Sequence, residues 1–330
     1  MTNDNGSWAQ GFWTGMLWLS YEFTGNKKYS ELALKHIGDF SIRIKKRLGV
    51  NHHDMGFLYC PSCVTAYRLF GDSKAKEAAI LAADNLCSRF NERSKFIQAW
   101  GKIGAEDNFR LIIDCMMNLP LLFWAADVTG NENYRRIAKS HLKTSVKYVI
   151  RDDGTTYHTY FFDRKTGKPL KGVTAQGYSD NSVWARGQAW GIYGTALGYT
   201  HTMDDSLIEK FRLVEDAFEK RLPKDFIPAW DMVFTDTKTT KDTSASAAAI
   251  CGILLMNRFL KSKPLEKTAL LMTEVLQSCH TDEKSNGILA HAVYSMPANL
   301  GVDECNIWGD YFYMEALMRI KNPGWKSCWE

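Results

Sequence analysis

The sequence lacks a strong excess of either charge and any long apolar run. Its 330 residues carry 41 Lys and Arg against 37 Asp and Glu, a formal net charge of +4. There is no dense Lys/Arg stretch with interleaved aromatics, so a nucleic-acid partner has little electrostatic support. No uninterrupted run of about 18 apolar residues and no basic, apolar leader is found, so we expect neither membrane spanning nor export.

The eight cysteines do not form a metal-binding pattern. Only Cys60 and Cys63 have CxxC spacing, and a second such pair, which a structural zinc site needs, is missing. Most of the cysteines fall in apolar helical segments, where a free thiol behaves as a small hydrophobe. We therefore expect reduced thiols in a cytoplasmic protein without metal or cofactor.

Strand signals are sparse and no linker divides the chain, whereas helical spacing recurs throughout. Very apolar helices alternate with charged amphipathic ones, separated by Gly or Asp turns. The expected pairs are 11–22 with 29–44, 54–69 with 75–89, 113–128 with 134–149, 187–203 with 206–220 and 243–260 with 265–277, followed by a last apolar helix at 306–320. This self-similarity is typical of stacked helical hairpins. It predicts one all-α domain over residues 1–330, an (α/α)6 barrel.

The predicted barrel has six inner helices but only five outer ones. A first outer helix would have to precede Trp8, where only a short polar stretch exists, so either the chain is short at this end or the ring is completed differently. The longest irregular stretch, residues 152–186, is rich in Gly, Thr, Tyr and Asp. Loops of that length inside a compact domain are usually functional.

Aromatic and polar residues are abundant where a ligand cleft is expected. The 11 Trp and 14 Tyr slightly favour a cleft for sugars or other ring ligands. The inner helices begin at one rim, so the polar residues that open them should converge: His52, His53, Asp54, Asp114, Arg186, Gln188, Thr243, Ser244 and Asp310. For any single Asp at a helix start, an N-cap is the first interpretation.

Asp114 does not fit the N-cap interpretation well. It stands in an apolar segment, and a carboxylate in such surroundings needs a partner or a raised pKa. A carboxyl that keeps its proton near neutral pH suits general acid catalysis.

Separated motifs resemble glycoside hydrolase family 88, the unsaturated glucuronyl hydrolases. They stand in order along nearly the whole chain, at residues 53–57 (HDMGF), 113–120 (IDCMMNLP), 176–178 (QGY), 182–190 (SVWARGQAW) and 306–311 (NIWGDY). The resemblance implies an (α/α)6 barrel without metal. It also implies hydrolysis that begins by hydrating the C4=C5 double bond of a 4,5-unsaturated uronic acid at the non-reducing end of a lyase-generated oligosaccharide.

The resemblance also assigns roles to individual residues. Asp114 is implied as the acid and base, and Asp54 as the second essential carboxylate. Positions implied to contact the sugar, its carboxylate or the aglycone, or to form aromatic walls, are Trp8, Trp100, His158, Gln176, Arg186, Trp190 and Ser295.

Structural alternatives remain for several of these residues. His158, between Tyr157 and Thr159, could be a hydrogen-bonded strut, and Arg186 could cap a helix or pair with an acid. A uronate nevertheless needs a cation, and Arg binds carboxylate bidentately. His52, His53 and Asp54 could suggest a metal site. We consider it improbable, because adjacent helical residues point apart and no third ligand is suitably spaced.

One stretch departs from the family pattern. Members that accept sulfated glycosaminoglycan disaccharides carry Ser-x-x-Ser-x-Lys, whereas here Ser295 is followed by Ala298 and Leu300 at the last two positions. A hydroxyl and a cation that could hold a sulfate are missing. We therefore predict a preference for unsulfated substrates.

Two other functions stay open at this point. An unsaturated rhamnogalacturonyl hydrolase would have the same fold and chemistry but a pectin-derived substrate. A non-catalytic helical sugar-binding protein would spread its polar residues along a concave face instead of gathering them at the starts of the inner helices. For the enzyme we expect a monomer or weak homodimer whose partners are unsaturated oligosaccharides.

Overall fold

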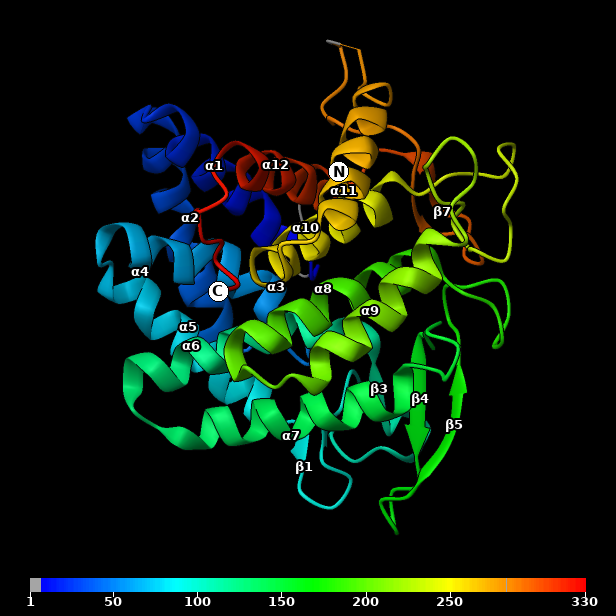
Figure 1. Ribbon diagram of the computed structural model, residues 1–330. Helices are drawn as coiled ribbons and strands as arrows, with labels where there is room; N and C mark the ends of the chain where they lie inside the picture. Colours follow the sequence, from blue (N-terminus) through cyan, green and yellow to red (C-terminus); the bar gives the residue numbers. More distant parts are fainter. Residues whose placement is uncertain (1–6, 283) are drawn as a thin grey trace.

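The computed structural model describes residues 7–282 and 284–330 as two rings of helices (Figure 1). The inner ring consists of α1 (Gln10–Thr24), α3 (Met55–Tyr59) continued by η1 (Cys60–Val64) and α4 (Thr65–Phe70), η3 (Ile113–Asn118) continued by α6 (Pro120–Thr129), α8 (Ala185–Thr202), α10 (Thr243–Leu260) and α12 (Ile307–Lys321). The outer helices are α2 (Lys27–Lys45), α5 (Ser73–Cys87), α7 (Glu132–Val149), α9 (Ser206–Glu219) and α11 (Lys263–Gln277). The predicted helical barrel is confirmed.

One rim of the barrel is built from tight turns with a repeated chemistry. Inner helices α1, α4 and α6 each end at a glycine in the left-handed region, where a side chain would be strained. The next residue caps the following outer helix, as Asn26, Asp72 and Asn131 accept backbone N–H groups. In each pair the chain therefore reverses direction within two residues, and the outer helix packs against the inner helix before it.

The two rings differ in burial as their sequences predict. Every residue of α8 from Ala185 to Tyr199 is buried, whereas α9 and α11 bury only one stripe. Helix α10 is long and apolar enough to cross a membrane, but 72% of that window is buried inside the molecule. The position of α10 in the inner ring accounts for its hydropathy. One apolar helix of this length is weak evidence for a membrane span.

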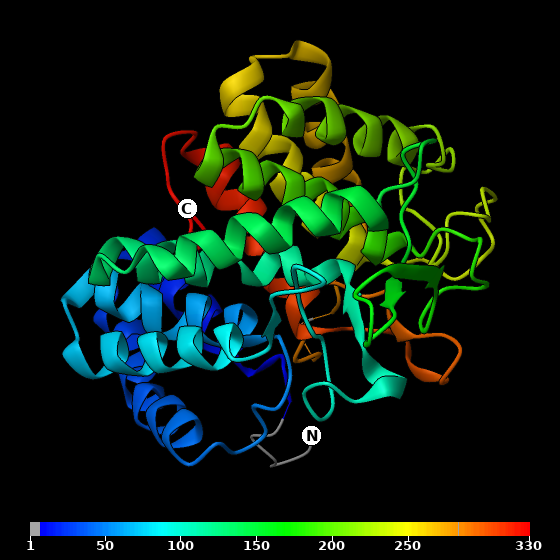
Figure 2. The ribbon, with the colours of Figure 1, turned by 90° about the horizontal axis from the view of Figure 1, so that it is seen from below.

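The opposite rim carries long loops and small antiparallel sheets (Figures 1 and 2). The strands are β1 (Phe90–Asn91), β2 (Phe96–Ile97), β3 (Arg110–Ile112), β4 (Thr159–Phe162), β5 (Pro169–Val173), β6 (Ala292–Ser295) and β7 (Leu300–Glu304). They form the sheets β1-β2, β3-β4-β5 and β6-β7. Strands of two to five residues are too short for a clear period-two pattern. The stretch 152–186 was therefore predicted to be irregular, but it contains β4 and β5.

A second difference lies at the start of the third inner helix. The sequence predicts one helix over 113–128, but residues Ile113–Asn118 form a 3-10 segment and α6 begins only at Pro120. Pro lacks a backbone N–H, so it fits the first turn of a helix better than its interior. The break places Asp114 on a tighter turn at the rim.

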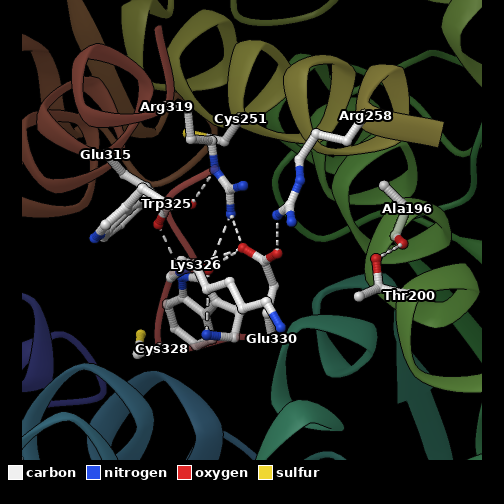
Figure 3. A network of polar contacts seen from close by, with 12 residues as sticks. Ala196, Thr200, Cys251, Arg258, Glu315, Arg319, Trp325, Lys326, Cys328 and Glu330 are labelled. Carbon is white, nitrogen blue, oxygen red and sulfur yellow. Dashed lines mark hydrogen bonds and ion pairs between the residues drawn. The ribbon is translucent and has the colours of Figure 1, made fainter. Parts of the chain in front are cut away.

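The C-terminal segment is tied to the inner helices by a buried polar network (Figure 3). Arg319 of α12 lies 2.9 Å from Glu315 and 3.1 Å from Glu330, all three nearly fully buried. Glu315 also accepts a hydrogen bond from the Trp329 indole at 2.8 Å, and Arg258 of α10 pairs with Glu330. The network fixes residues 325–330 beside α12 and α10.

Among residues 7–282 and 284–330, no helix precedes α1. A first outer helix would have to precede Trp8, and residues 1–6 lie outside the described part. Trp13 of α1 is 45% exposed and Leu317 of α12 is 38% exposed. The neighbouring inner helices α1 and α12 thus expose apolar side chains to solvent on the side where other inner helices have an outer partner.

Candidate active site

Close packing between α3 and η3 brings the two predicted catalytic carboxyls together. Gly56 follows Asp54 by two residues, and a Cβ built on it would lie only 2.4 Å from the Cα of Asn118. The Asn118 side chain accepts the N–H of Phe57 at 3.0 Å and donates to the carbonyl of Asp114 at 3.2 Å. The glycine in the first motif therefore allows Asn118 of the second to join the two segments.

Asp54 is held by the two histidines before it. Its Oδ2 lies 2.9 Å from His52 Nδ1, and its Oδ1 lies 3.3 Å from His53 Nε2. Burial acts to raise the pKa of Asp54, but His53 and the hydrogen bond with His52 outweigh it, and the pKa lies below its usual value. Asp54 is therefore the ionised carboxylate of the site.

Asp114 has the opposite character. Its side chain is 22% exposed, and its Oδ1 lies 3.3 Å from His53 Nε2 without hydrogen-bond geometry. Burial first, and then the negative charge of Asp54, raise the pKa of Asp114 well above its ordinary value. A carboxyl that is partly accessible and keeps its proton can deliver that proton to a bound substrate.

His53 lies between the two carboxyls. It is fully buried, and its ring nitrogens have no hydrogen-bond partner among the described residues. Burial lowers the pKa of His53 to about 4, although the nearby Asp54 acts in the opposite direction. At neutral pH the ring is thus uncharged and carries a single proton, which on Nε2 would face both carboxyls.

His158 presents one nitrogen to the site in a defined tautomer. Its Nδ1 accepts the backbone N–H of Ala175 at 3.0 Å and lies 2.9 Å from the hydroxyl of Thr159. Burial, followed by the charge of Arg110, lowers the pKa of His158 to about 3. The neutral ring therefore carries its proton on Nε2, which is a hydrogen-bond donor without a protein partner in the described structure.

Arg186 is anchored by protein groups. It is 2% exposed and pairs with Asp242 at 2.9 Å. Its terminal nitrogens also donate to the carbonyls of Val293 and Tyr294 and to Oε1 of Gln176. The interpretation that Arg186 pairs with an acid is confirmed, and the same bonds orient Gln176. A direct contact of Arg186 or Gln176 with the sugar stays a prediction.

The predicted aromatic walls differ in exposure. Trp8 and Trp100 are partly exposed, and Trp8 packs 4.9 Å from Trp308 between ring centroids. Trp190 is only 1% exposed and lies in the core against Phe57 and Phe312. The burial of Trp190 argues against its predicted contact with the sugar, and the ring packs within the core instead. Ser295 lies on β6, 9% exposed, and pairs with Leu300 of β7.

The fold supplies the third group that a metal site lacked in the sequence. One ligand atom each from His53, Asp54 and Asp114 lies within 4.8 Å of the others. The expectation that adjacent residues point apart was wrong here, because His52 and His53 precede α3 and both contact Asp54. Both carboxyls would have to be ionised to bind a cation, so the absence of a metal from the reaction stays a prediction of the family resemblance.

Sequence reasoning missed two buried carboxylates and one cation. Asp242 neutralises Arg186, and Asp231 holds the loop before α8 by accepting N–H groups of Tyr178 and Val183. Asp242 stands directly before a helix and could only be interpreted as an N-cap. The cation is Arg110, whose guanidinium lies 4.4 Å from the Trp100 ring.

An α/α barrel with a proton-holding carboxyl, an ionised partner and aromatic walls is the arrangement of a glycosidase. Residues 1–322 match Glycosyl Hydrolase Family 88. The chain therefore belongs to this family, as its motifs predict.

The similar proteins have related names. The chain is 47% identical to "Unsaturated chondroitin disaccharide hydrolase" of Streptococcus agalactiae, over 99% of this chain and 84% of that protein. It is 38% identical to "Unsaturated glucuronyl hydrolase" of Bacillus sp. (strain GL1), over 97% and 87%. The crystal structure of unsaturated glucuronyl hydrolase from Streptococcus agalactiae superposes with a TM-score of 0.96 at 46% identity, covering 99% of this chain and 84% of that one.

Proposed function

We propose that the protein removes the 4,5-unsaturated uronic acid from the non-reducing end of oligosaccharides produced by polysaccharide lyases. The observation that carries this proposal is the Asp114 carboxyl, which holds its proton beside the ionised Asp54. The names of the similar proteins support the same substrate class.

The reaction needs one group that first gives and then takes a proton. Asp114 protonates C4 of the C4=C5 double bond, and the positive charge that develops at C5 is shared with the ring oxygen. Water adds to C5 and returns its proton to Asp114. The resulting hemiketal opens and releases the aglycone, so one water molecule is consumed and the enzyme is regenerated. This chemistry does not need two carboxyls at the spacing of an ordinary glycosidase.

The neighbours of Asp114 have separate tasks in this proposal. Asp54 keeps the proton on Asp114 by its negative charge, and the His53 ring lies between the two carboxyls. His158 donates its Nε2 proton to the sugar, Trp8 and Trp100 flank it, and Arg186 holds Gln176 in place.

The β6–β7 hairpin supports a preference for unsulfated substrates. Ser295 pairs with Leu300, so the position that carries Lys in sulfate-accepting family members faces Ser295 across the hairpin. Leu300 is 51% exposed and offers a sulfate neither charge nor a hydrogen bond. We expect faster cleavage of unsulfated than of 6-sulfated unsaturated chondroitin disaccharide. The reverse order would contradict this preference.

The test of the function is a panel of unsaturated disaccharides from chondroitin, hyaluronan, gellan and rhamnogalacturonan. Hydration destroys the conjugated enoate, so turnover appears as a loss of ultraviolet absorbance. Wild-type protein should consume glucuronyl substrates, and Asp114→Asn should lose at least about 100-fold in rate, the usual contribution of general acid–base catalysis. Unchanged melting temperature and retained disaccharide binding would show that Asp114→Asn is folded.

Two results would contradict the proposal. Full activity of Asp114→Asn would exclude Asp114 as the proton donor. Turnover of only the rhamnogalacturonan-derived disaccharide would assign the protein to the pectin pathway instead.

The cellular setting also belongs to the proposal. We expect a cytoplasmic monomer or weak homodimer that binds neither nucleic acid nor membrane. The eight free thiols, most of them buried, support a reducing compartment. Sedimentation at several concentrations and cell fractionation test these points.

A further inference from the structure

Arg110 on β3 is a cation without an acidic partner in the described residues. Its guanidinium lies 4.4 Å from the centroid of the Trp100 ring and 5.2 Å from that of Phe161. No carboxylate of the described residues forms an ion pair with it, and its Nε is buried without a hydrogen-bond partner. Partial burial lowers the pKa of Arg110, and the opposing effect of the Asp107 charge, which acts to raise it, is smaller.

Backbone pairing connects β3, which carries Arg110, to the turn that carries Asp54. The carbonyl of Arg110 accepts the N–H of Ala99 at 3.0 Å, and the carbonyl of Ala99 accepts the N–H of His53 at 2.8 Å. Trp100 forms a bridge with His52. Arg110 is thus one segment away from the His52–Asp54 turn. Its charge also acts on His158, whose Nε2 proton is free.

The other arginines near the site are already satisfied. Arg186 is neutralised by Asp242. Arg89 donates to Asn51 and to the carbonyls of Gln98 and Gly101. Trp100 and Phe161 pack against the Arg110 guanidinium, and its N–H groups have no hydrogen-bond partner among the described residues. Among the described residues, Arg110 is thus an arginine near the site whose charge no carboxylate neutralises at ion-pair distance.

We infer that Arg110 is a specificity-determining residue that binds an acidic group of the sugar substrate. The anion is the uronate carboxylate, which the planar guanidinium can bind through two hydrogen bonds; a sulfate ester is the alternative that the test distinguishes. The Trp100 ring packs against the guanidinium, and the Nε2 proton of His158, directly before β4, is the second donor. This inference rests on the proposed function for the identity of the sugar.

The test separates binding from turnover by using Asp114→Asn as the background. Calorimetry measures its affinity for an unsaturated chondroitin disaccharide, for the methyl ester of the same uronate, and for the 6-sulfated disaccharide. Adding Arg110→Gln should weaken binding of the recognised anion about 10- to 100-fold, the range of a charge-assisted hydrogen bond. Loss with the acid but not with the ester identifies the carboxylate, and loss confined to the 6-sulfated ligand identifies the sulfate.

Two variants control for folding and for net charge. Arg110→Lys keeps the charge without the planar fork and should retain part of the discrimination. Arg212→Gln removes an exposed arginine from α9 and should change no affinity. Equal effects of Arg110→Gln on all three ligands, or no effect, would overturn the inference. So would the absence of binding by any of the three. Turnover by wild-type protein is measured separately, so failure of the proposed function is distinguishable.

Discussion

Asp54 and Asp114 are the same residue type within 4.8 Å of each other, yet their surroundings drive their pKa values apart. Burial acts on both in the same direction. The difference comes from the effects of His53 and His52 on Asp54, of which only His52 contacts Asp54 alone, and from the charge of Asp54, which acts on Asp114. Two carboxyls so close cannot both ionise easily, and one of them keeps the proton.

This pair predicts a pH profile for turnover. Asp114 must be protonated, so activity should fall as pH rises through its raised pKa. Removing the negative charge in Asp54→Asn should lower the pKa of Asp114. The alkaline limb of the residual kcat/KM should therefore move to lower pH.

The measurement is the residual rate of Asp54→Asn against wild type over the neutral and alkaline range. A control is Asp153→Asn, which removes a largely exposed carboxylate and should leave the limb in place. An alkaline limb that keeps its position in Asp54→Asn would show that Asp54 does not set the protonation of Asp114.

At the scale of elements, the contact between α3 and η3 decides the geometry of the carboxyl pair. A methyl group at Gly56 would overlap the backbone of Asn118, so Gly56→Ala should push the two segments apart. We expect a loss of about 1–3 kcal/mol in unfolding free energy and a larger fall in kcat than partial unfolding explains.

The matched control is Gly38→Ala in α2. A Cβ there meets only the end of Lys74 at 3.6 Å. This change should raise stability by about 0.5–1 kcal/mol without altering kcat. Urea unfolding and rate measurements on both variants check the prediction, and equal behaviour of the two would contradict the packing argument.

The β6–β7 hairpin makes a gain-of-function prediction. Ala298 and Leu300 are exposed, so Ala298→Ser with Leu300→Lys should cost little stability. The pair restores the hydroxyl and the cation missing from the family pattern. The ratio of rates on 6-sulfated and unsulfated disaccharides should rise about 10-fold or more, as for one charge-assisted bond. A ratio that stays constant would place sulfate recognition elsewhere.

At the scale of the whole molecule, the Arg319 network joins the end of the chain to the inner ring (Figure 3). Arg319→Met would leave Glu315 and Glu330 buried without their main cation. We expect a loss of about 3–5 kcal/mol in unfolding free energy, typical of breaking a buried pair. The folded fraction should keep its kcat, because the network lies outside the site.

Lys220→Met is the control for this prediction, because it breaks the exposed Lys220–Asp216 pair and should cost less than about 1 kcal/mol. Denaturant unfolding compares the two variants. A loss below about 1 kcal/mol for Arg319→Met would mean that the tail is held by packing alone.

The sequence by itself determined the helical barrel, because the alternation of apolar and amphipathic helices needs only local spacing and capping chemistry. It also indicated the family, because segments such as HDMGF and IDCMMNLP follow one another in the family's order. Asp114 was predicted to be a buried acid because its neighbours in sequence are apolar.

Only the tertiary structure decided what each of these residues contacts. The short strands, the pairing of Arg186 with Asp242, the burial of Trp190 and the unpaired charge of Arg110 depend on segments distant in sequence. Charge and hydrogen-bond energies depend on ångström distances and on local burial, and neither is encoded in residue spacing along one helix.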